Sequence, residues 1–191
     1  MVKIKFKAEL KGEDVLDKKV LILGEVGSGK TKLAARLIQE LMQLVGPKEI
    51  TVIDLAPERK GIVGGKLIDY ADLIGKVKYL SPEKVYTPRL SGSSREEVLR
   101  YAKLNKETMK PLLKEFIANP TRALIVNDVT LYLHLGKLET VLKCASLART
   151  FLVTAYYGSR LAEDLGTGIS RRERQLIDEL ATFMDLVIKI G

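Results

Sequence analysis

The segment from Gly24 to Thr31 has the residue types that binding of a phosphate group requires. It reads Gly-Glu-Val-Gly-Ser-Gly-Lys-Thr and fits the pattern G-x-x-x-x-G-K-[ST]. Glycines let the backbone fold round an anion with its N–H groups pointing inward, and a following helix adds its positive N-terminal end. Lys30 would reach the β and γ phosphates of a nucleoside triphosphate, and the Thr31 hydroxyl would coordinate Mg²⁺. We therefore expect ATP and Mg²⁺ to bind at Gly24, Glu25, Val26, Gly27, Ser28, Gly29, Lys30 and Thr31.

The sequence on either side of this segment predicts the elements that such a loop requires. Residues 20–23 form a short, continuous apolar run, which is typical of a strand covered on both faces of a parallel sheet. From Lys30 to Val45 apolar residues recur at helical spacing, and Gly46-Pro47 ends the pattern. A strand, a glycine loop and a helix are therefore expected to follow one another directly.

The alternation of strands and helices continues to residue 190. Strands are predicted at residues 50–53, 77–80, 123–126, 151–155 and 186–190, and helices at 94–118, 137–148 and 171–184. The longest helix should open on a capping box made by Ser94 and Glu97, and should be kinked or divided near Pro111. Residues 2–10 alternate apolar and polar, which predicts an additional, half-buried strand. We expect one α/β domain over residues 1–191, a three-layer sandwich with a mainly parallel central sheet and an extra N-terminal edge strand.

The predicted strand, phosphate-binding loop and helix at residues 20–45 resemble those of the P-loop NTPases. The resemblance implies the P-loop NTPase fold and a nucleotide as ligand, but this superfamily includes many activities. Its members hold magnesium through water with an acid at the end of a second buried strand. Asp128, which follows the apolar run 123–126, is the expected acid, although a shift of one position would exchange its role with that of Asn127. Many such ATPases place a glutamate next, to orient the attacking water, but this chain has Val129, so its catalytic base must lie elsewhere or be missing.

The order of these features resembles that of the RecA-like ATPases within the superfamily. In that group a glutamate beyond the strand that follows the phosphate-loop helix acts on the attacking water, and Glu58 or Asp54 is the corresponding candidate. The alternative for Glu58 is a solvated loop acid or a structural partner of Arg59 and Lys60. A polar residue at the end of the strand between the two motif strands senses the γ phosphate, a role for which Thr154 is the candidate. Tyr156 or Tyr157 could stack on the base, although aromatic residues after a strand often only pack.

Arginines are concentrated in the last quarter of the chain, and one of them could stabilise charge that develops on a neighbouring subunit's nucleotide. Arg160 is the first choice for this role. The alternatives are a solvated surface or, at the start of the predicted helix, a bound anion. The other arginines of this group are Arg149, Arg171, Arg172 and Arg174.

Composition and charge bear on the partners. The net charge of +8 and the pI near 9.5 suit contact with nucleic acid, but the basic residues are mixed with 24 acids along the whole chain. The high content of charged residues is also typical of heat-adapted proteins. One cysteine, Cys144, allows no internal disulfide, and one histidine, His134, argues against a structural zinc site. No apolar run approaches the roughly 18 residues of a membrane span, so we expect a cytoplasmic protein.

The first functional hypothesis is a Mg²⁺-dependent, RecA-like ATPase that couples hydrolysis to a conformational change. Nucleic acid and further copies of the same chain are the partners that this hypothesis allows. A small-molecule or nucleotide kinase is an alternative, with residues 158–174 as a lid over the phosphates. A regulatory nucleotide-binding module with little hydrolysis is a third, while a GTPase is disfavoured because the guanine-reading motif Asn-Lys-x-Asp is absent.

Overall fold

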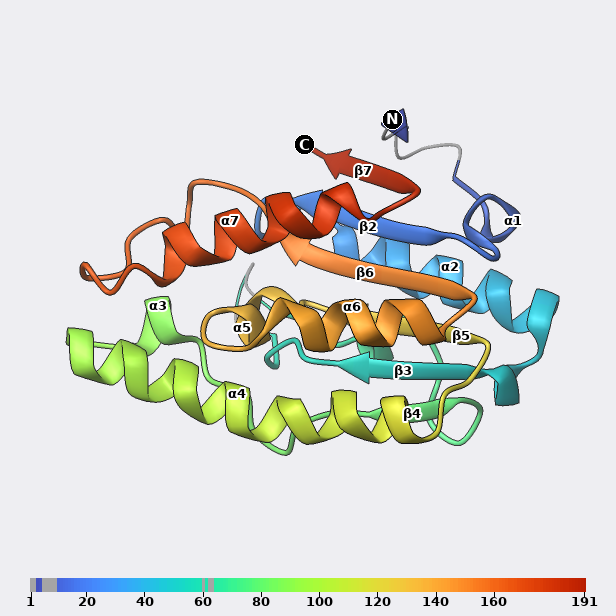
Figure 1. The fold of residues 1–191 in the computed structure, drawn as a ribbon, viewed down its shortest axis with the longest axis horizontal. Helices are drawn as coiled ribbons and strands as arrows, with labels where there is room; N and C mark the ends of the chain where they lie inside the picture. Colours follow the sequence, from blue (N-terminus) through green and yellow to red (C-terminus); the bar gives the residue numbers. More distant parts are fainter. Residues whose placement is uncertain (1–2, 5–9, 60, 62–63) are drawn as a thin grey trace.

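The computed structural model describes residues 3–4, 10–59, 61 and 64–191. Within these residues the strands form a seven-stranded sheet in the order β1-β7-β2-β6-β5-β3-β4, with every adjacent pair parallel (Figure 1). The strands are β1 (Lys3–Ile4), β2 (Lys19–Gly24), β3 (Ile50–Asp54), β4 (Lys78–Leu80), β5 (Ala123–Asn127), β6 (Thr150–Tyr156) and β7 (Leu186–Ile190).

Helices cover both faces of the sheet and complete a three-layer sandwich. In Figure 1 helices α4, α6 and α7 lie in front of the sheet and α2 lies behind it. The helices are α1 (Gly12–Val15), α2 (Lys30–Val45), α3 (Pro88–Ser91), α4 (Arg95–Ala118), α5 (Thr130–Leu133), α6 (Leu138–Leu147) and α7 (Ile169–Thr182), with short 3-10 helices η2 (Pro47–Glu49) and η3 (Leu67–Asp69). None of the described helices is both long enough and apolar enough to cross a bilayer.

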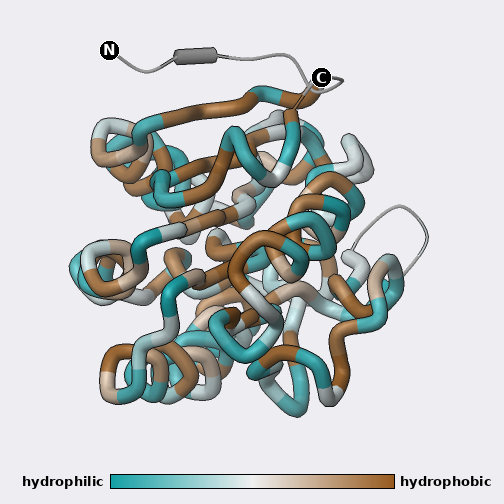
Figure 2. Tube along the Cα trace, turned by 90° about the vertical axis from the view of Figure 1, so that its right-hand side faces the viewer, coloured by the Kyte–Doolittle hydropathy of each residue, from teal (hydrophilic) through white to brown (hydrophobic). Residues whose placement is uncertain are grey.

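Each face of the sheet has its own apolar core because side chains alternate along every strand. In β2, Leu21 and Leu23 pack into the core beneath α4, α6 and α7, whereas Val20 and Ile22 pack against α2. Figure 2 shows the apolar stretches running through the interior, with hydrophilic residues on the outer turns. Strands β3, β5 and β6 are buried at every position, and their sequences are accordingly mostly apolar.

The predicted fold class is confirmed, and apart from the N-terminal strand each predicted strand and helix begins and ends within two residues of the observed one. Of the predicted N-terminal strand, Lys3–Ile4 form β1 at the edge beside β7, Leu10 lies outside any strand, and residues 2 and 5–9 fall outside the described residues. The helix was expected to be kinked or divided near Pro111, and division is wrong, because α4 runs through Pro111 without a break. At its start the Glu97 N–H donates to Ser94 Oγ at 3.2 Å, but the Glu97 carboxylate accepts from the N–H of Ser93 rather than that of Ser94.

The strand order brings the ends of four strands together at one edge of the sheet. β6 lies between β2, which leads into the phosphate-binding loop, and β5, which leads into Asp128. β3 lies on the other side of β5. Since all four strands are parallel, the residues that follow them meet at the carboxyl edge, where ligands of open α/β sheets bind.

Candidate functional site

The phosphate-binding loop connects the end of β2 at Gly24 to the start of α2 at Lys30. Gly27 and Gly29 have φ angles of 75° and 90°, in the left-handed region. A side chain would be strained in either place, and Gly29 directly precedes the first turn of α2. The two glycines thus let the loop turn back over the helix N-terminus, where free backbone N–H groups attract anions.

Lys30 is held beneath this loop by the loop's own backbone. Its ammonium group donates hydrogen bonds to the carbonyl oxygens of Gly24, at 3.0 Å, and Glu25, at 2.7 Å. Burial lowers the pKa of the Lys30 ammonium group, and the carboxylates of Asp128 and Glu25 act in the opposite direction. The side chain is therefore fixed at the position where a phosphate oxygen could replace the carbonyl oxygens as acceptor.

Asn127, the last residue of β5, links three strands at the carboxyl edge. Its Oδ1 accepts a hydrogen bond from Thr154 Oγ1 of β6 at 2.8 Å, and its Nδ2 donates to Asp54 Oδ1 of β3 at 2.9 Å. The same Oδ1 lies 3.5 Å from Thr31 Oγ1, a long and weak contact. Asn127 thus faces the hydroxyl that is expected to coordinate magnesium.

The Asp128 side chain faces Thr130 rather than Thr31. Its carboxylate accepts a short hydrogen bond from Thr130 Oγ1, while its backbone N–H donates to Thr154 Oγ1 at 2.8 Å. Its φ of 56° lies in the left-handed region, which aspartate and asparagine tolerate better than other side chains. Burial raises the pKa of the Asp128 carboxyl, although Thr130 and Lys30 partly oppose this effect.

Lys30, Thr31, Asn127, Asp128 and Thr154 line one cavity of about 90 Å³. The described residues contain no cluster of three or more His, Cys, Asp or Glu side chains that could hold a metal ion. The side chains of Thr31, Asn127 and Asp128 bring oxygen atoms to this cavity, and a few protein oxygens suit an Mg²⁺ ion that the phosphates of a nucleotide and water largely coordinate.

The two candidates at the end of β3 lie in different surroundings. Glu58 is exposed and lines a separate cavity beside Lys66 and Tyr86, so the structure does not bring it into the cavity that contains Lys30. Asp54 is buried and accepts hydrogen bonds from the Leu67 N–H at 2.6 Å and the Tyr79 hydroxyl at 2.7 Å, besides the one from Asn127. Its lone pairs are therefore occupied by the protein.

The tyrosine and arginine candidates in the last quarter of the chain also lie in different surroundings. Tyr156 is buried in the cavity wall, and Tyr157 packs under the guanidinium group of Arg174, 3.6 Å from the ring centroid. Arg160 is exposed. The remaining arginines differ in their contacts: Arg171 is exposed, Arg172 and Arg174 donate to the carbonyl oxygens of Gly136 and Gly158, and Arg149 lies 3.6 Å from the Asp17 carboxylate.

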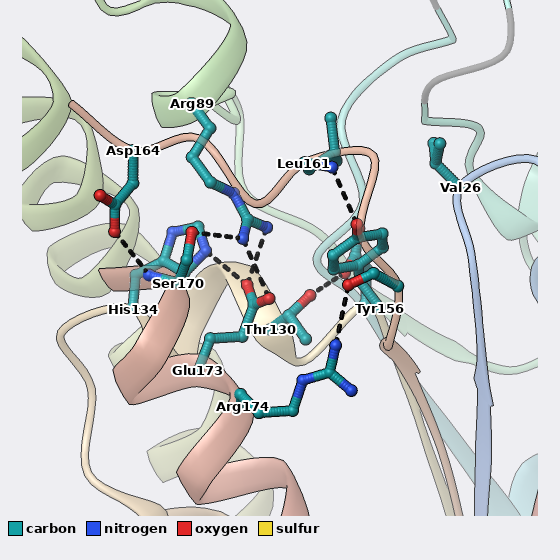
Figure 3. Close-up of polar contacts among 12 residues, drawn as sticks. Val26, Arg89, Thr130, His134, Tyr156, Leu161, Asp164, Ser170, Glu173 and Arg174 are labelled. Carbon is teal, nitrogen blue, oxygen red and sulfur yellow. Dashed lines mark hydrogen bonds and ion pairs between the residues drawn. The ribbon is translucent and has the colours of Figure 1, made fainter. Parts of the chain in front are cut away.

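A buried ionic network in the cavity wall was not predicted from the sequence (Figure 3). Arg89 of α3 donates to both carboxylate oxygens of Glu173 of α7, at 3.1 and 2.9 Å, and to Ser170 Oγ at 3.1 Å. Glu173 Oε2 also lies 2.7 Å from His134 Nε2. In the sequence His134 lies 39 positions from Glu173, and Arg89 lies 84 positions from it, so no local pattern marks these groups.

Comparison with known proteins adds one family and two distant structures. The family model described as the central domain of the helicase HerA matches residues 3–190. The crystal structure of the flagellar accessory protein FlaH from Methanocaldococcus jannaschii has 11% identity and a TM-score of 0.49, covering 91% of this chain and 71% of that one. An ATPase from the type III secretion system of pathogenic bacteria has 13% identity and a TM-score of 0.40, covering 91% of this chain and 51% of that one. No curated protein matches the chain in sequence. Because the family model spans almost the whole chain, the protein belongs to the family of the HerA helicase central domain, and it is a P-loop ATPase.

Proposed function

We propose that Gly24–Thr31 bind the phosphates of ATP with Mg²⁺, and that hydrolysis proceeds by positioning and charge neutralisation. The observation that carries this proposal is the Lys30 ammonium group, which the carbonyl oxygens of Gly24 and Glu25 hold within the loop. Bound magnesium would neutralise charge on the phosphates, with Thr31 as one of its protein ligands. Lys30→Ala tests the proposal, with Lys32→Ala as control.

The contacts at the end of β5 favour the exchanged assignment of Asn127 and Asp128. Asn127 faces Thr31, so we place it beside the magnesium ion, where its amide oxygen would bind the ion or one of its waters. Asp128 lines the same cavity but turns toward Thr130, so we place it beside the attacking water as the proton acceptor. A carboxylate whose pKa is raised is a stronger base than an ordinary aspartate.

Thr154 is proposed to sense the γ phosphate. Its hydroxyl donates to Asn127 and accepts from the Asp128 N–H, so it joins the two residues on which we place the metal and the water. A shift of the γ phosphate would therefore change the positions of both Asn127 and Asp128 through this one hydroxyl.

Glu58 remains a weaker candidate for the base, because the loop that follows β3 would have to move to bring it into the cavity that contains Lys30.

Residues 1–191 are proposed to act as one domain, since both apolar cores share a single sheet.

The exposed position of Arg160 supports a role at a neighbouring copy's nucleotide. Lys30→Ala and Arg160→Ala should each be nearly inactive alone. Mixed in equal amounts, they should recover about a quarter of wild-type turnover, because a quarter of the sites would combine an intact Lys30 with a neighbour's intact Arg160. Phosphate release at fixed total protein measures this. Arg171→Ala, at another exposed arginine, should keep wild-type turnover, and a mixture no more active than its components would rule out the role in trans.

Nucleic acid is the proposed partner, and a row of lysines on α4 is the proposed contact. Lys103, Lys106, Lys110 and Lys114 fall within an arc of about 80° along about 17 Å of the helix. Within the described part of the chain, none of the last three makes an ion pair. This leaves their charge available to phosphates.

Replacing Lys106, Lys110 and Lys114 by glutamine should weaken DNA binding and reduce the slope of log affinity against log salt by about 2 to 3. Fluorescence anisotropy with single- and double-stranded DNA at several salt concentrations measures this slope. The matched control replaces Lys11, Lys48 and Lys137, which are exposed on other segments, and also lowers the net charge from +8 to +5, since 8 − 3 = 5. Equal losses in the two triple variants would show that only net charge matters.

A further inference from the structure

Glu25, the second residue of the phosphate-binding loop, reaches across to the segment that follows β6. Its Oε2 accepts hydrogen bonds from the backbone N–H groups of Ser159, at 2.8 Å, and Arg160, at 3.1 Å. Its Oε1 accepts from the N–H of Val26 within the loop, at 2.8 Å. One carboxylate therefore joins two segments that lie more than 130 positions apart in the sequence.

Gly158 makes this approach possible through its lack of a side chain. A Cβ atom at this position would lie 2.1 Å from Glu25 Oε2 and 2.4 Å from Glu25 Cδ, distances at which atoms overlap. On the other side of the segment, Arg174 of α7 donates to the Gly158 carbonyl oxygen at 2.8 Å. The peptide at position 158 is thus held between the phosphate-binding loop and α7.

The backbone N–H of the next residue, Leu161, is also bound by a side chain near Glu25. The Leu161 N–H donates to the Tyr156 hydroxyl at 2.9 Å (Figure 3). That hydroxyl also interacts with the Glu25 side chain. The N–H groups of three successive residues, 159–161, are therefore bound by side chains around the phosphate-binding loop. Successive amides arranged in this way favour a negative charge.

The electrostatics favour the ionised form of the Glu25 carboxyl group at neutral pH. Burial disfavours the charged form of Glu25, but hydrogen bonds from Val26, Arg160 and Ser159 outweigh it and lower the pKa to about 2. The charge also favours the protonated form of Lys30. Because the pKa is lowered in the folded state, the stabilisation is complete above the usual value of 4.5 and is lost as the pH falls toward 2.

We propose that Glu25 is a positioning residue for ATP hydrolysis, which holds Gly158–Arg160 against the phosphate-binding loop so that the loop and the segment carrying Arg160 keep one relative position. The inference rests on the proposed function, since it assumes that this loop binds the phosphates. It assigns the Glu25 side chain no contact with the nucleotide. Its effect on the reaction passes through the shape of the loop and the placement of Arg160.

The test compares wild type with Glu25→Gln, which removes the charge, and Gly158→Ala, which displaces the carboxylate by steric overlap. In each, hydrogen exchange at the Ser159 and Arg160 amides should become at least about tenfold faster, because charge-assisted hydrogen bonds are the stronger ones. The KM for ATP should rise by a similar factor. The double variant should be no worse than the worse single variant, because both substitutions break one contact. Ser159→Ala keeps the backbone amide and should leave both readouts unchanged.

Thermal unfolding of the same variants separates positioning from stability. The Tm difference between wild type and Glu25→Gln should be constant above pH 5 and should shrink as the pH falls from 4.5 toward 2. At neutral pH the KM should stay raised at temperatures where both variants are fully folded. Should Gly158→Ala fail to fold, Glu25→Ala takes its place.

Unchanged exchange at Ser159 and Arg160 in Glu25→Gln would overturn the inference. Faster exchange with unchanged KM and kcat would also overturn it, since Glu25 would then serve the fold alone. Failure of the proposed function looks different: wild type would then bind and hydrolyse no ATP, although the exchange at Ser159 and Arg160 would still depend on Glu25.

Discussion

Replacement of Lys30 by alanine should lower the rate of ATP hydrolysis by about 10³-fold or more, as expected for the loss of a fixed positive group that meets charge developing in phosphoryl transfer. The side chain is already held in the loop by two backbone carbonyls, so the enzyme needs little reorganisation to present it to a phosphate. Release of phosphate at saturating ATP measures the change. Thermal unfolding should show that the variant is folded.

Lys32→Ala is the matched control for this change. Lys32 is also a lysine in the first turn of α2, but it is exposed, so its loss should alter turnover less than about threefold. A Lys30→Ala protein that kept a tenth or more of wild-type turnover would refute the assignment of the phosphate site. Equal losses in the two variants would point to a general effect of charge at the helix N-terminus.

Asp128→Asn should lower kcat by about 10² to 10³-fold and leave the magnesium dependence unchanged, because the substitution removes a base and keeps its shape. Asparagine tolerates the left-handed backbone at this position, so strain should not obscure the result. Titration of activity with Mg²⁺ at fixed ATP separates the two assignments. If Asp128 instead holds the metal through water, the variant will need more magnesium, and high magnesium will restore its turnover.

Asn127→Ala gives the complementary measurement. It removes the amide that lies 3.5 Å from Thr31 Oγ1 and should raise the magnesium concentration at half-maximal activity. Some loss of stability is also expected, because Thr154 and Asp54 would each lose a buried hydrogen-bond partner. Comparison of magnesium titrations rather than of maximal rates avoids this complication.

Much of the fold follows from local patterns in the sequence. Strands buried on both faces need mostly apolar side chains, so the runs at residues 20–23, 50–53 and 123–126 predicted β2, β3 and β5. Parallel strands with helical connections then determine which ends meet. The position of β6 between β2 and β5 followed from the order of the motifs by resemblance, and the sheet confirms it.

At Pro111 the packing of α4 outweighs the tendency of proline to interrupt a helix. A proline removes one backbone hydrogen bond and disturbs the preceding turn. Pro111 is exposed, so the affected carbonyl group can bond water, while Met109 and Leu113 on the other side of α4 stay packed in the core. Packing of the apolar face therefore keeps the helix continuous.

The polar contacts of the site depend on register and on distant partners, which the sequence does not encode locally. Whether Asn127 or Asp128 faces Thr31 depends on the residue at which β5 ends, and a shift of one position reverses the answer. The approach of Glu25 to Ser159, and that of His134 to Glu173, join segments that meet only in the folded sheet. A glycine at position 158 was the one available signal for the first contact, but its meaning depended on the neighbour that the fold supplies.

The measurement that tests the central claim most directly is phosphate release from ATP by the wild-type chain, with magnesium and with magnesium removed by a chelator. We predict turnover that requires magnesium and that is lost in Lys30→Ala but not in Lys32→Ala. Parallel assays with GTP, and with single- and double-stranded DNA, would define the nucleotide and show whether nucleic acid accelerates the reaction. The account would be contradicted by a folded wild-type protein that neither binds nor hydrolyses ATP with magnesium, alone or with DNA.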